Sequence, residues 1–397
     1  MMAMGAAEAS IESSGFPLAF RVDPNGPNLK ALALTDSTVR IRTMARVLAG
    51  MQKEAIIQYG STGTLWRVVC DEGPWLNGTD LAPFPLAFFA AGVAASLMSE
   101  FLGEARDRDI RIDSLNLVQD NFFTMEGSAL KGTMAAGVQP MQVSISARSN
   151  ASVTDIENIA ETAMRNRSPA ERCLREILTS GFVVRANNEE LAWPGKGADT
   201  VAALSDPAEV FDDIRPLSNG GTTLIRKSGS VAKSHGAAVG LAAEQKRVVH
   251  VRTEGSIRQD GLKSVDVQCI QPAGSRFRIL SDDSKVIGGQ ERAPSGLAFL
   301  SAGVAFCFMT QIGRYAQITK QRLKGYRIIQ DTAFRLARDH EPDAFAVETL
   351  VCLDTDEPRD KSIQLVRMAE QTCYIHATYR TPTATEVTVG DRPTAVP

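Results

Sequence analysis

Cysteine is the residue type in this chain with the clearest chemical potential, because a thiolate is a strong nucleophile that can be oxidised reversibly. The 397 residues include six cysteines, none of them in a Cys-x-x-Cys pair, so a zinc ribbon or a thioredoxin-type motif is not predicted. They are Cys70, Cys173, Cys269, Cys307, Cys352 and Cys373. In a reducing cytoplasm, which is the compartment we expect in the absence of a visible secretory signal, most such thiols are small core residues.

Two cysteines lie in stretches that could hold a working thiol. Cys307 lies in the apolar run SGLAFLSAGVAFCFMTQIGRYAQ, and Cys373 precedes His376 by three residues, which would place both on one helix face. Either thiol could instead be a packed core residue. His376 could assist a thiol or bind a metal or haem iron, or could simply be half-buried and hydrogen-bonded. The four histidines show no spacing typical of a metal site, so none is predicted.

The apolar run around Cys307 has a counterpart earlier in the chain, FPLAFFAAGVAASLMSEFLGEAR. When Pro83 is aligned with Pro294, Ser96 falls on Cys307. Three alternating runs precede each copy; two alternating runs, a second helical stretch and a last strand-like run follow it. Each half is therefore predicted as β-β-β-α-β-β-α-β, an α+β unit with an antiparallel sheet against helices.

The repeat suggests how the chain is divided. We expect a flexible N-terminal segment over residues 1–36, a first unit over 37–186, a linker over 187–246 and a second unit over 247–392. The first helix of each unit is apolar nearly all round, so it must be buried by its own sheet and by a partner. The two units are therefore predicted to pack as a pseudo-dimer within one chain.

Composition limits the partners. The formal net charge is −3 and 44% of the residues are hydrophobic, which argues against a nucleic-acid footprint or a polybasic membrane surface. From the sequence we expect no apolar run to reach the roughly 18 residues of a membrane span. We therefore predict a cytoplasmic protein without nucleic-acid or membrane partners.

Two motifs resemble the OsmC/Ohr family of thiol-dependent peroxidases and related stress proteins. SAGVAFCF is similar to the family's first-cysteine helix, and CYIHATYR is similar to its second-cysteine helix. Family members pair as intertwined homodimers, so this chain resembles a fused, tandem member. The resemblance implies that Cys307 attacks the peroxide, that Cys373 resolves the product, and that Arg258 in TEGSIRQDG stabilises the thiolate.

The chain also departs from the family pattern. The first half has Ser96 and Ser168 at the cysteine positions, so it is the degenerate half. In the second half Ser295 replaces the glutamate of the family's Pro-Glu pair, and Glu291 or Glu254 could supply the carboxylate instead. The proline-to-cysteine spacing is two residues longer than in the family. Either a short insertion precedes Cys307, or Ala305 lies at the family's cysteine position, about 200° of helix rotation away.

These patterns leave three functions open. The first is a peroxidase that reduces a hydrophobic organic hydroperoxide through Cys307 and Cys373, with a dithiol or lipoyl-type reductant and no cofactor. The second is an oxygenase that binds haem in the same apolar pocket through His376 or a cysteine and oxidises an aromatic alkene such as a phenylpropene. The third is a non-catalytic protein that binds a hydrophobic ligand. Further self-association is compatible with each of these functions.

Overall fold

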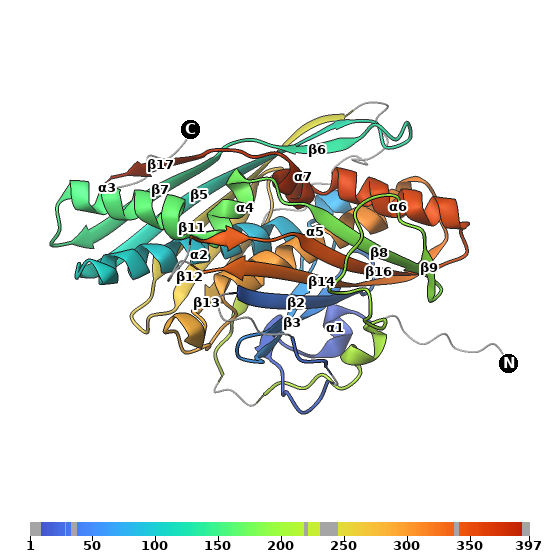
Figure 1. The fold of residues 1–397 in the computed structure, drawn as a ribbon, viewed down its shortest axis with the longest axis horizontal. Coiled ribbons are helices and arrows are strands. Elements are labelled where there is room, and N and C mark those ends of the chain that lie inside the picture. The colour runs from blue at the N-terminus through green and yellow to red at the C-terminus, as the bar shows by residue number, and fades with distance from the viewer. Residues whose placement is uncertain are drawn as a thin grey trace.

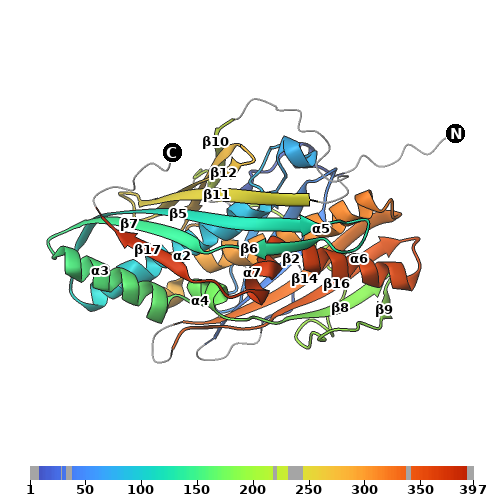
Figure 2. The same cartoon turned by 90° about the horizontal axis from the view of Figure 1, so that it is seen from above.

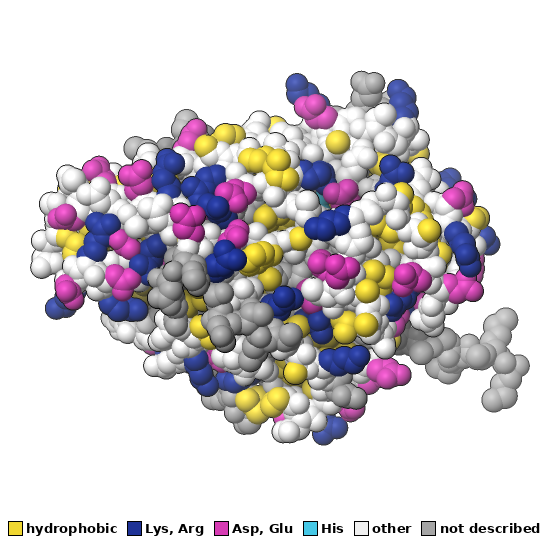
Figure 3. All heavy atoms as spheres, viewed as in Figure 1, with side chains coloured by type: hydrophobic (Ala, Val, Ile, Leu, Met, Phe, Trp, Pro, Cys, Tyr) yellow, Lys and Arg dark blue, Asp and Glu magenta, His cyan; other side chains and the backbone are white. Residues whose placement is uncertain are grey.

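The computed structural model describes residues 9–27, 29–32, 38–217, 221–230, 245–336 and 341–390. Two β-sheets enclose two long helices, and shorter helices lie beside them (Figures 1 and 2). The mixture of helices and sheets is the α+β class that the sequence predicts. On the face shown in Figure 3, acidic and basic side chains are interspersed, with small hydrophobic areas between them.

The first sheet has the strand order β1-β4-β3-β2-β14-β16-β8-β9. Its strands are β1 (Ala19–Arg21), β4 (Leu65–Cys70), β3 (Lys53–Tyr59), β2 (Thr38–Val47), β14 (Leu323–Arg335), β16 (Val347–Thr355), β8 (Ser180–Ala186) and β9 (Glu189–Leu191), with β15 (Asp343–Ala344) added beside β14. The second sheet has the order β10-β13-β12-β11-β5-β7-β17. Its strands are β10 (Ile225–Gly229), β13 (Arg276–Ser281), β12 (Lys263–Gln271), β11 (Gln245–Ile257), β5 (Ile112–Gly127), β7 (Met141–Ser149) and β17 (Thr385–Val389), with β6 (Ala135–Val138) beside β5.

Each sheet is built from both halves of the chain. Strand β2 of the first half pairs antiparallel with β14 of the second, and β11 of the second half pairs antiparallel with β5 of the first. The prediction that each unit has a sheet of its own is therefore wrong. The order of the main elements along each half is as predicted, with a short additional strand in each half and the second helix divided into shorter pieces. Alternation of apolar residues reports that a strand has one buried face, but it does not report which strand lies next to it.

The sequence predicts antiparallel sheets, but each sheet also contains a parallel strand pair. Strand β8 pairs parallel with β16, and β17 pairs parallel with β7. In each case the last strand of one half lies beside a strand of the other half. This pairing is a second place at which the two halves are interlocked.

The helices divide into two long central ones and several short ones. The long ones are α2 (Pro85–Asp107) and α5 (Gly296–Ile318). The others are α1 (Ile11–Ser14), α3 (Val153–Thr162), a π-helical segment (Ala163–Arg167), α4 (Pro169–Arg175), α6 (Arg359–Thr372) and α7 (Tyr374–Arg380), together with 3-10 turns at Pro74–Leu76, Ala208–Phe211 and Lys285–Ile287. The second helical stretch predicted for the second half is divided into α6 and α7 at Cys373, which caps α7.

Both central helices pass a length and composition test for a membrane span, so the judgement that no apolar run is long enough was too strict. Their apolar windows are, however, 78% and 94% buried inside the protein. Helix α2 packs on β11 and β12, α5 packs on β2 and β3, and the two helices pack on each other. As predicted, each apolar helix is enclosed by a sheet and by a partner helix. The strands β11 and β12 beside α2, and β2 and β3 beside α5, come from the other half of the chain.

Two segments expected to be irregular contribute to the sheets. In the N-terminal segment, β1 forms an edge of the first sheet by pairing with β4, so this part is not a flexible tail. In the predicted linker, β9 pairs with β8 and β10 pairs with β13. Residues 1–8, 28, 33–37, 218–220 and 231–244 of these two segments lie outside the described residues.

Glycines bring α2 and α5 into unusually close contact. A Cβ added at Gly92 would lie 2.4 Å from the backbone N of Leu300, and one added at Gly303 would lie 2.5 Å from the backbone N of Phe89. Gly92 and Gly303 are equivalent positions in the sequence repeat, so the contact is made twice in the same way. Only glycine lets the two backbones approach this closely, because any side chain would overlap the facing helix.

We expect Gly92→Ala to lower the free energy of unfolding by about 1–3 kcal/mol or more, because the added methyl group must push the helices apart. Urea unfolding of the full chain measures this change. Gly197→Ala is the matched control, because Gly197 is exposed and a Cβ there meets nothing within 4 Å. Equal stability of the two variants would contradict the close-contact interpretation.

Candidate functional site

The structure brings Cys307 and Cys373 together. Cys307 lies on α5 and Cys373 is the N-cap of α7, and both side chains are buried. The next residue on α5, Phe308, packs its ring 5.2 Å from the ring of His376 on α7. Burial raises the pKa of the Cys373 thiol well above its usual value, and a hydrogen bond to Cys307 together with the charge on Cys307 raises it further. Both cysteines are free thiols.

The longer spacing between proline and cysteine does not turn Cys307 away from Cys373. Helix α5 runs without interruption from Gly296 to Ile318, so no inserted bulge separates Pro294 from the thiol. Cys307 nevertheless interacts with Cys373. The rotation of Cys307 about the axis of α5 that follows from the longer Pro294-to-Cys307 spacing is thus compatible with a thiol pair.

A buried carboxylate lies near this thiol pair. Glu72 follows β4 and is fully buried; its Oε1 accepts a hydrogen bond from Thr310 Oγ1 of α5 at 2.8 Å. Burial raises the pKa of Glu72, whereas the positive charge of Lys53, the Thr310 hydrogen bond and the positive charge of Arg314 oppose the rise. Lys53 is also buried, and its Nζ donates to the carbonyl oxygen of Met51 at 2.7 Å. Glu72 and Lys53 come from the first half, and Thr310 comes from the second.

The cation on the same helix as Cys307 is Arg314. Seven residues separate the two, which is close to two helical turns and places them on one face of α5. Burial lowers the pKa of Arg314 and the charge of Arg247 lowers it further, while Tyr374, Glu72 and Cys307 act in the opposite direction. Arg314 therefore lies close enough to Cys307 for their charges to interact, and it can stabilise a thiolate.

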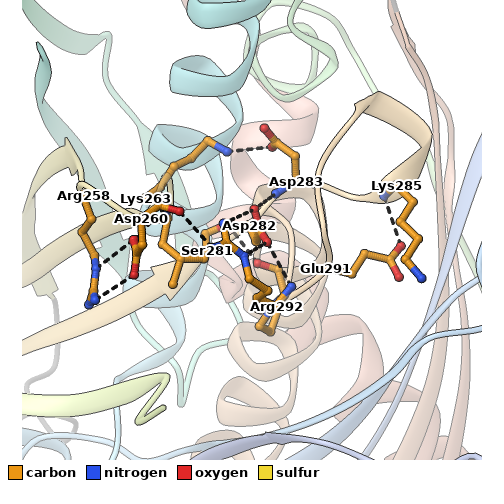
Figure 4. Close-up of polar contacts among 11 residues, drawn as sticks. Arg258, Asp260, Lys263, Ser281, Asp282, Asp283, Lys285, Glu291 and Arg292 are labelled. Carbon is orange, nitrogen blue, oxygen red and sulfur yellow. Dashed lines mark hydrogen bonds and ion pairs between the residues drawn. The ribbon is translucent and has the colours of Figure 1, made fainter. Parts of the chain in front are cut away.

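A similar set of polar groups occurs at the opposite end of the helix pair. Ser99 Oγ of α2 donates to Asp283 Oδ1 at 2.5 Å. Lys263 Nζ lies 2.7 Å from the same oxygen (Figure 4). With Pro83 aligned to Pro294, Ser99 corresponds to Thr310 and Asp283 corresponds to Glu72. Lys263 starts β12 as Lys53 starts β3.

The end of the helix pair with Ser99, Asp283 and Lys263 has no thiols at the corresponding positions. Ser96 stands at the position of Cys307, and Ser168 caps α4 as Cys373 caps α7. Both cap residues have extended backbone, and the Ser168 side chain accepts a hydrogen bond from the Glu171 backbone N–H at 3.1 Å. Ser96 and Ser168 thus occupy places in the fold that are equivalent to those of Cys307 and Cys373.

Arg258 does not join the Cys307 cluster, so its assignment as the guanidinium beside Cys307 is corrected. Its side chain is 46% exposed and pairs with Asp260 at 2.9 Å (Figure 4). The hairpin that carries it connects β11 and β12, which pack on α2. Because the halves exchange strands, a hairpin of the second half faces the helix of the first, and sequence proximity to Cys307 does not become spatial proximity.

The two carboxylates considered as replacements are also engaged elsewhere. Glu291 is buried, and its Oε2 accepts from Thr64 Oγ1 of the first half at 2.7 Å. Glu254 forms an ion pair with Arg276 on the surface of the second sheet. Neither interacts with the thiol pair in the contacts that the described residues make.

The sequence contains patterns that mark Glu72 and Arg314 as candidate site residues. The acidic pairs Asp71–Glu72 and Asp282–Asp283 precede Pro83 and Pro294 at the same distance, so the repeat itself marks them. Arg314 is a lone cation in an apolar helix, at a spacing that places it beneath Cys307. A cation on the same face of an apolar helix as a cysteine was therefore a stronger candidate for stabilising the thiolate than a cation in an exposed turn.

His376 is fully buried and encircled by aromatic rings. Its ring lies 5.9 Å from Phe182, 5.2 Å from Phe308 and 6.4 Å from Tyr379. Neither ring nitrogen has a hydrogen-bond partner among the described residues, in contrast to the half-buried, hydrogen-bonded histidine that the sequence favoured. Burial, followed by the charge of Arg380, lowers its pKa to about 3.

The expected apolar surroundings of the thiols are present. Phe88 packs against Phe299 and Phe306 between the two helices, with ring centroids 6.0 and 5.3 Å apart. Five cavities of about 300 to 610 Å³ are formed by described residues, and Cys307 and Cys373 line none of these five. Among the described residues no cluster of three or more histidine, cysteine or acidic side chains suits a metal ion.

Comparisons with known proteins add little to this geometry. No protein-family model matches the chain, and no curated protein matches it. A solved structure of an OsmC-like hydroperoxide resistance protein from Jannaschia sp. CCS1 is similar over 32% of this chain and 81% of its own, with 22% sequence identity. Its TM-score is 0.20, so this likeness carries no argument about the present chain.

The buried His376 predicts a pH-dependent loss of stability. Its folded pKa of about 3 lies below the unfolded value of about 6.5, so between these pH values only the unfolded chain gains the proton. Stability should therefore fall as the pH is lowered through this range, by up to about 1.4 kcal/mol per pH unit.

The measurement is the free energy of urea unfolding of the wild type and of His376→Phe from pH 7 to pH 4. The variant lacks the titrating group, so the stability difference between the two proteins should change steadily in favour of the variant as the pH falls. A difference that stays constant would show that the histidine binds its proton equally well in both states.

Proposed function

We propose that this protein is a peroxidase-like enzyme that reduces hydrophobic organic hydroperoxides with Cys307 and Cys373. The observation that carries the proposal is the contact between the two thiols, with the cation Arg314 on the helix face below Cys307. One buried thiol alone would more simply be a core residue. Two interacting thiols beside a buried guanidinium form a set that can be oxidised to a disulfide.

The proposed reaction has two steps. The Cys307 thiolate attacks one oxygen of the O–O bond, which breaks; the thiolate becomes a sulfenic acid and the other oxygen leaves as an alkoxide that takes a proton to become an alcohol. The Cys373 thiol then attacks the Cys307 sulfur, forming a disulfide and releasing water. A dithiol or lipoyl-type reductant supplies the two electrons that restore the thiols.

The charges near the thiols support the direction of this chemistry. Arg314 stabilises negative charge on Cys307 and on the departing oxygen. Burial and the neighbouring Cys307 raise the pKa of Cys373, which disfavours ionisation of the Cys373 thiol. We assign Cys307 as the nucleophile and Cys373 as the resolving thiol, which are the roles that the family resemblance implied.

We further infer that the two halves form a pseudo-dimer with one reactive end. The exchanged strands, the repeated glycine contact and the matched Ser99–Asp283 and Thr310–Glu72 hydrogen bonds support this view. In it the first half supplies Glu72 and Lys53 to the thiol site, and the second half supplies the thiols and Arg314. The serine end keeps the interface without the redox chemistry.

We expect Cys307→Ser to reduce turnover of cumene hydroperoxide to the uncatalysed background, because a hydroxyl cannot replace the thiolate. Cys373→Ser should allow one equivalent of peroxide to be consumed per protein molecule without forming a disulfide. A coupled dithiol assay and free-thiol titration follow these outcomes. Cys352→Ser is the control, since Cys352 lies in a separate core cluster; full activity in Cys307→Ser would end the proposal.

The site also predicts which arginine matters. Arg314→Met should slow peroxide reduction by roughly 10- to 100-fold, about the effect of losing one charged interaction worth 1.5–3 kcal/mol. Arg314→Lys should recover part of the rate, because it keeps the positive charge. Arg258→Met should react at nearly the wild-type rate, and a larger loss in Arg258→Met than in Arg314→Met would contradict the assignment.

A further inference from the structure

The last strands of the two halves, β8 and β17, occupy equivalent places in the repeat. Each pairs parallel with a strand of the other half, and Phe182 of β8 lies beside Thr349 while Val387 of β17 lies beside Val143. Thr349 and Val143 each lie opposite a buried glutamine of the next strand, so the two registers match. Val387 is therefore the counterpart of Phe182.

In the first half, the chain that follows β8 covers the outer edge of this strand. Strand β9 pairs with the end of β8, and further along the Phe182 N–H donates to the carbonyl oxygen of Lys196 at 3.0 Å. The ring of Trp193, from the same segment, packs 5.2 Å from the ring of Phe182. The edge is thus covered by a backbone hydrogen bond and by an aromatic side chain together.

The corresponding edge of β17 is open in the part of the chain that the structure describes. Gly390 N–H donates to Ile145 O of β7, and successive N–H groups of a strand point to opposite sides, so Val387 N–H points away from β7. No described strand pairs with β17 on that side, and the Val387 side chain is 37% exposed. Thr385–Val389 contains neither the lysine nor the proline that usually protects a free edge, so this edge can accept another strand.

A cavity of about 480 Å³ lies beside this open edge, between β17, α3, the π-helical segment and α4 (Figures 1 and 2). Val387 and Val389 line it from the strand, and Met164 lines it from the helical side. It therefore adjoins the counterpart of the residue against which Trp193 packs in the first half. Its volume is large enough for one aromatic side chain, and its apolar walls suit one.

We propose that the outer edge of β17 binds an extended segment of another protein, which adds a strand at Val387 and places an aromatic side chain in the cavity. A carbonyl oxygen of the segment accepts from Val387 N–H, as Lys196 O accepts from Phe182 N–H in the first half. Backbone pairing of this kind supplies affinity, and the side-chain pocket supplies selectivity. Strand β17 of a second copy does not fit this site, because Thr385–Val389 has no aromatic residue to fill the cavity.

The probe is a fluorescently labelled synthetic peptide, EELAWPGKG, which copies residues 189–197 of the segment that covers β8. It is titrated with the full-length protein, and binding is followed by fluorescence anisotropy. We expect saturable binding to the wild type. A peptide with alanine in place of tryptophan should bind at least tenfold more weakly, because it leaves the cavity unfilled, and a scrambled peptide of the same composition should not saturate.

Val387→Pro tests the backbone contact, because proline removes the outward N–H and leaves the hydrogen bonds between β17 and β7 in place. It should weaken peptide binding at least tenfold with little change in melting temperature. Glu386→Gln is the matched control and should change binding by no more than about twofold, because the Glu386 N–H faces β7 and its side chain lies on the opposite face of the strand from Val387.

The peptide variants decide the question if Val387→Pro does not fold. The proposal is overturned if no peptide binds saturably to the wild type, if the alanine peptide binds as tightly as the tryptophan peptide, or if a folded Val387→Pro binds as the wild type does. A dimer of the free protein that Val387→Pro dissociates would also overturn it, by showing that a second copy occupies the edge. None of these outcomes depends on peroxidase activity.

Discussion

The close contact between α2 and α5 is the constraint on which the rest of the molecule depends. Gly92 and Gly303 let the two backbones approach closely, so each apolar helix covers the other and leaves only one side for a sheet. Strands from both halves then complete each sheet around the helix pair. Because neither helix could be buried by its own half alone, the two halves have no separate cores. Burial of the apolar surface of the helix pair therefore depends on the exchange of strands between the halves.

This shared core also explains why charged groups occur where they do. Glu72, Lys53 and Thr310 are buried at one end of the helix pair, and Asp283, Lys263 and Ser99 occupy corresponding places at the other. Buried charges are tolerated only when they are paired and hydrogen-bonded. Each end therefore keeps an acid, a lysine and a hydroxyl as a set, with members drawn from both halves, whether or not a thiol is present.

The two ends have diverged in what they add to this common set. One end has a thiol pair over Arg314, with His376 behind Cys373 sealed by aromatic rings. The other has serines at the thiol positions. Substitutions at a few positions thus separate an end with a thiol pair from an end with serines, while the interface that holds both remains in place. That separation is available only to a covalently joined pair, in which the two copies can change independently.

The sequence alone determined the repeat, the α+β order of each half and the burial of the two apolar helices, because these follow from local periodicity and from residues aligned between the copies. The two candidate thiols were indicated by the family resemblance. Tertiary structure alone decided that strands cross between halves, that Arg314 rather than Arg258 lies by Cys307, and that Glu72 is supplied by the opposite half. Strand pairing and the meeting of distant side chains depend on contacts between segments far apart in the chain, and no local pattern records which of the alternative partners buries the most apolar surface.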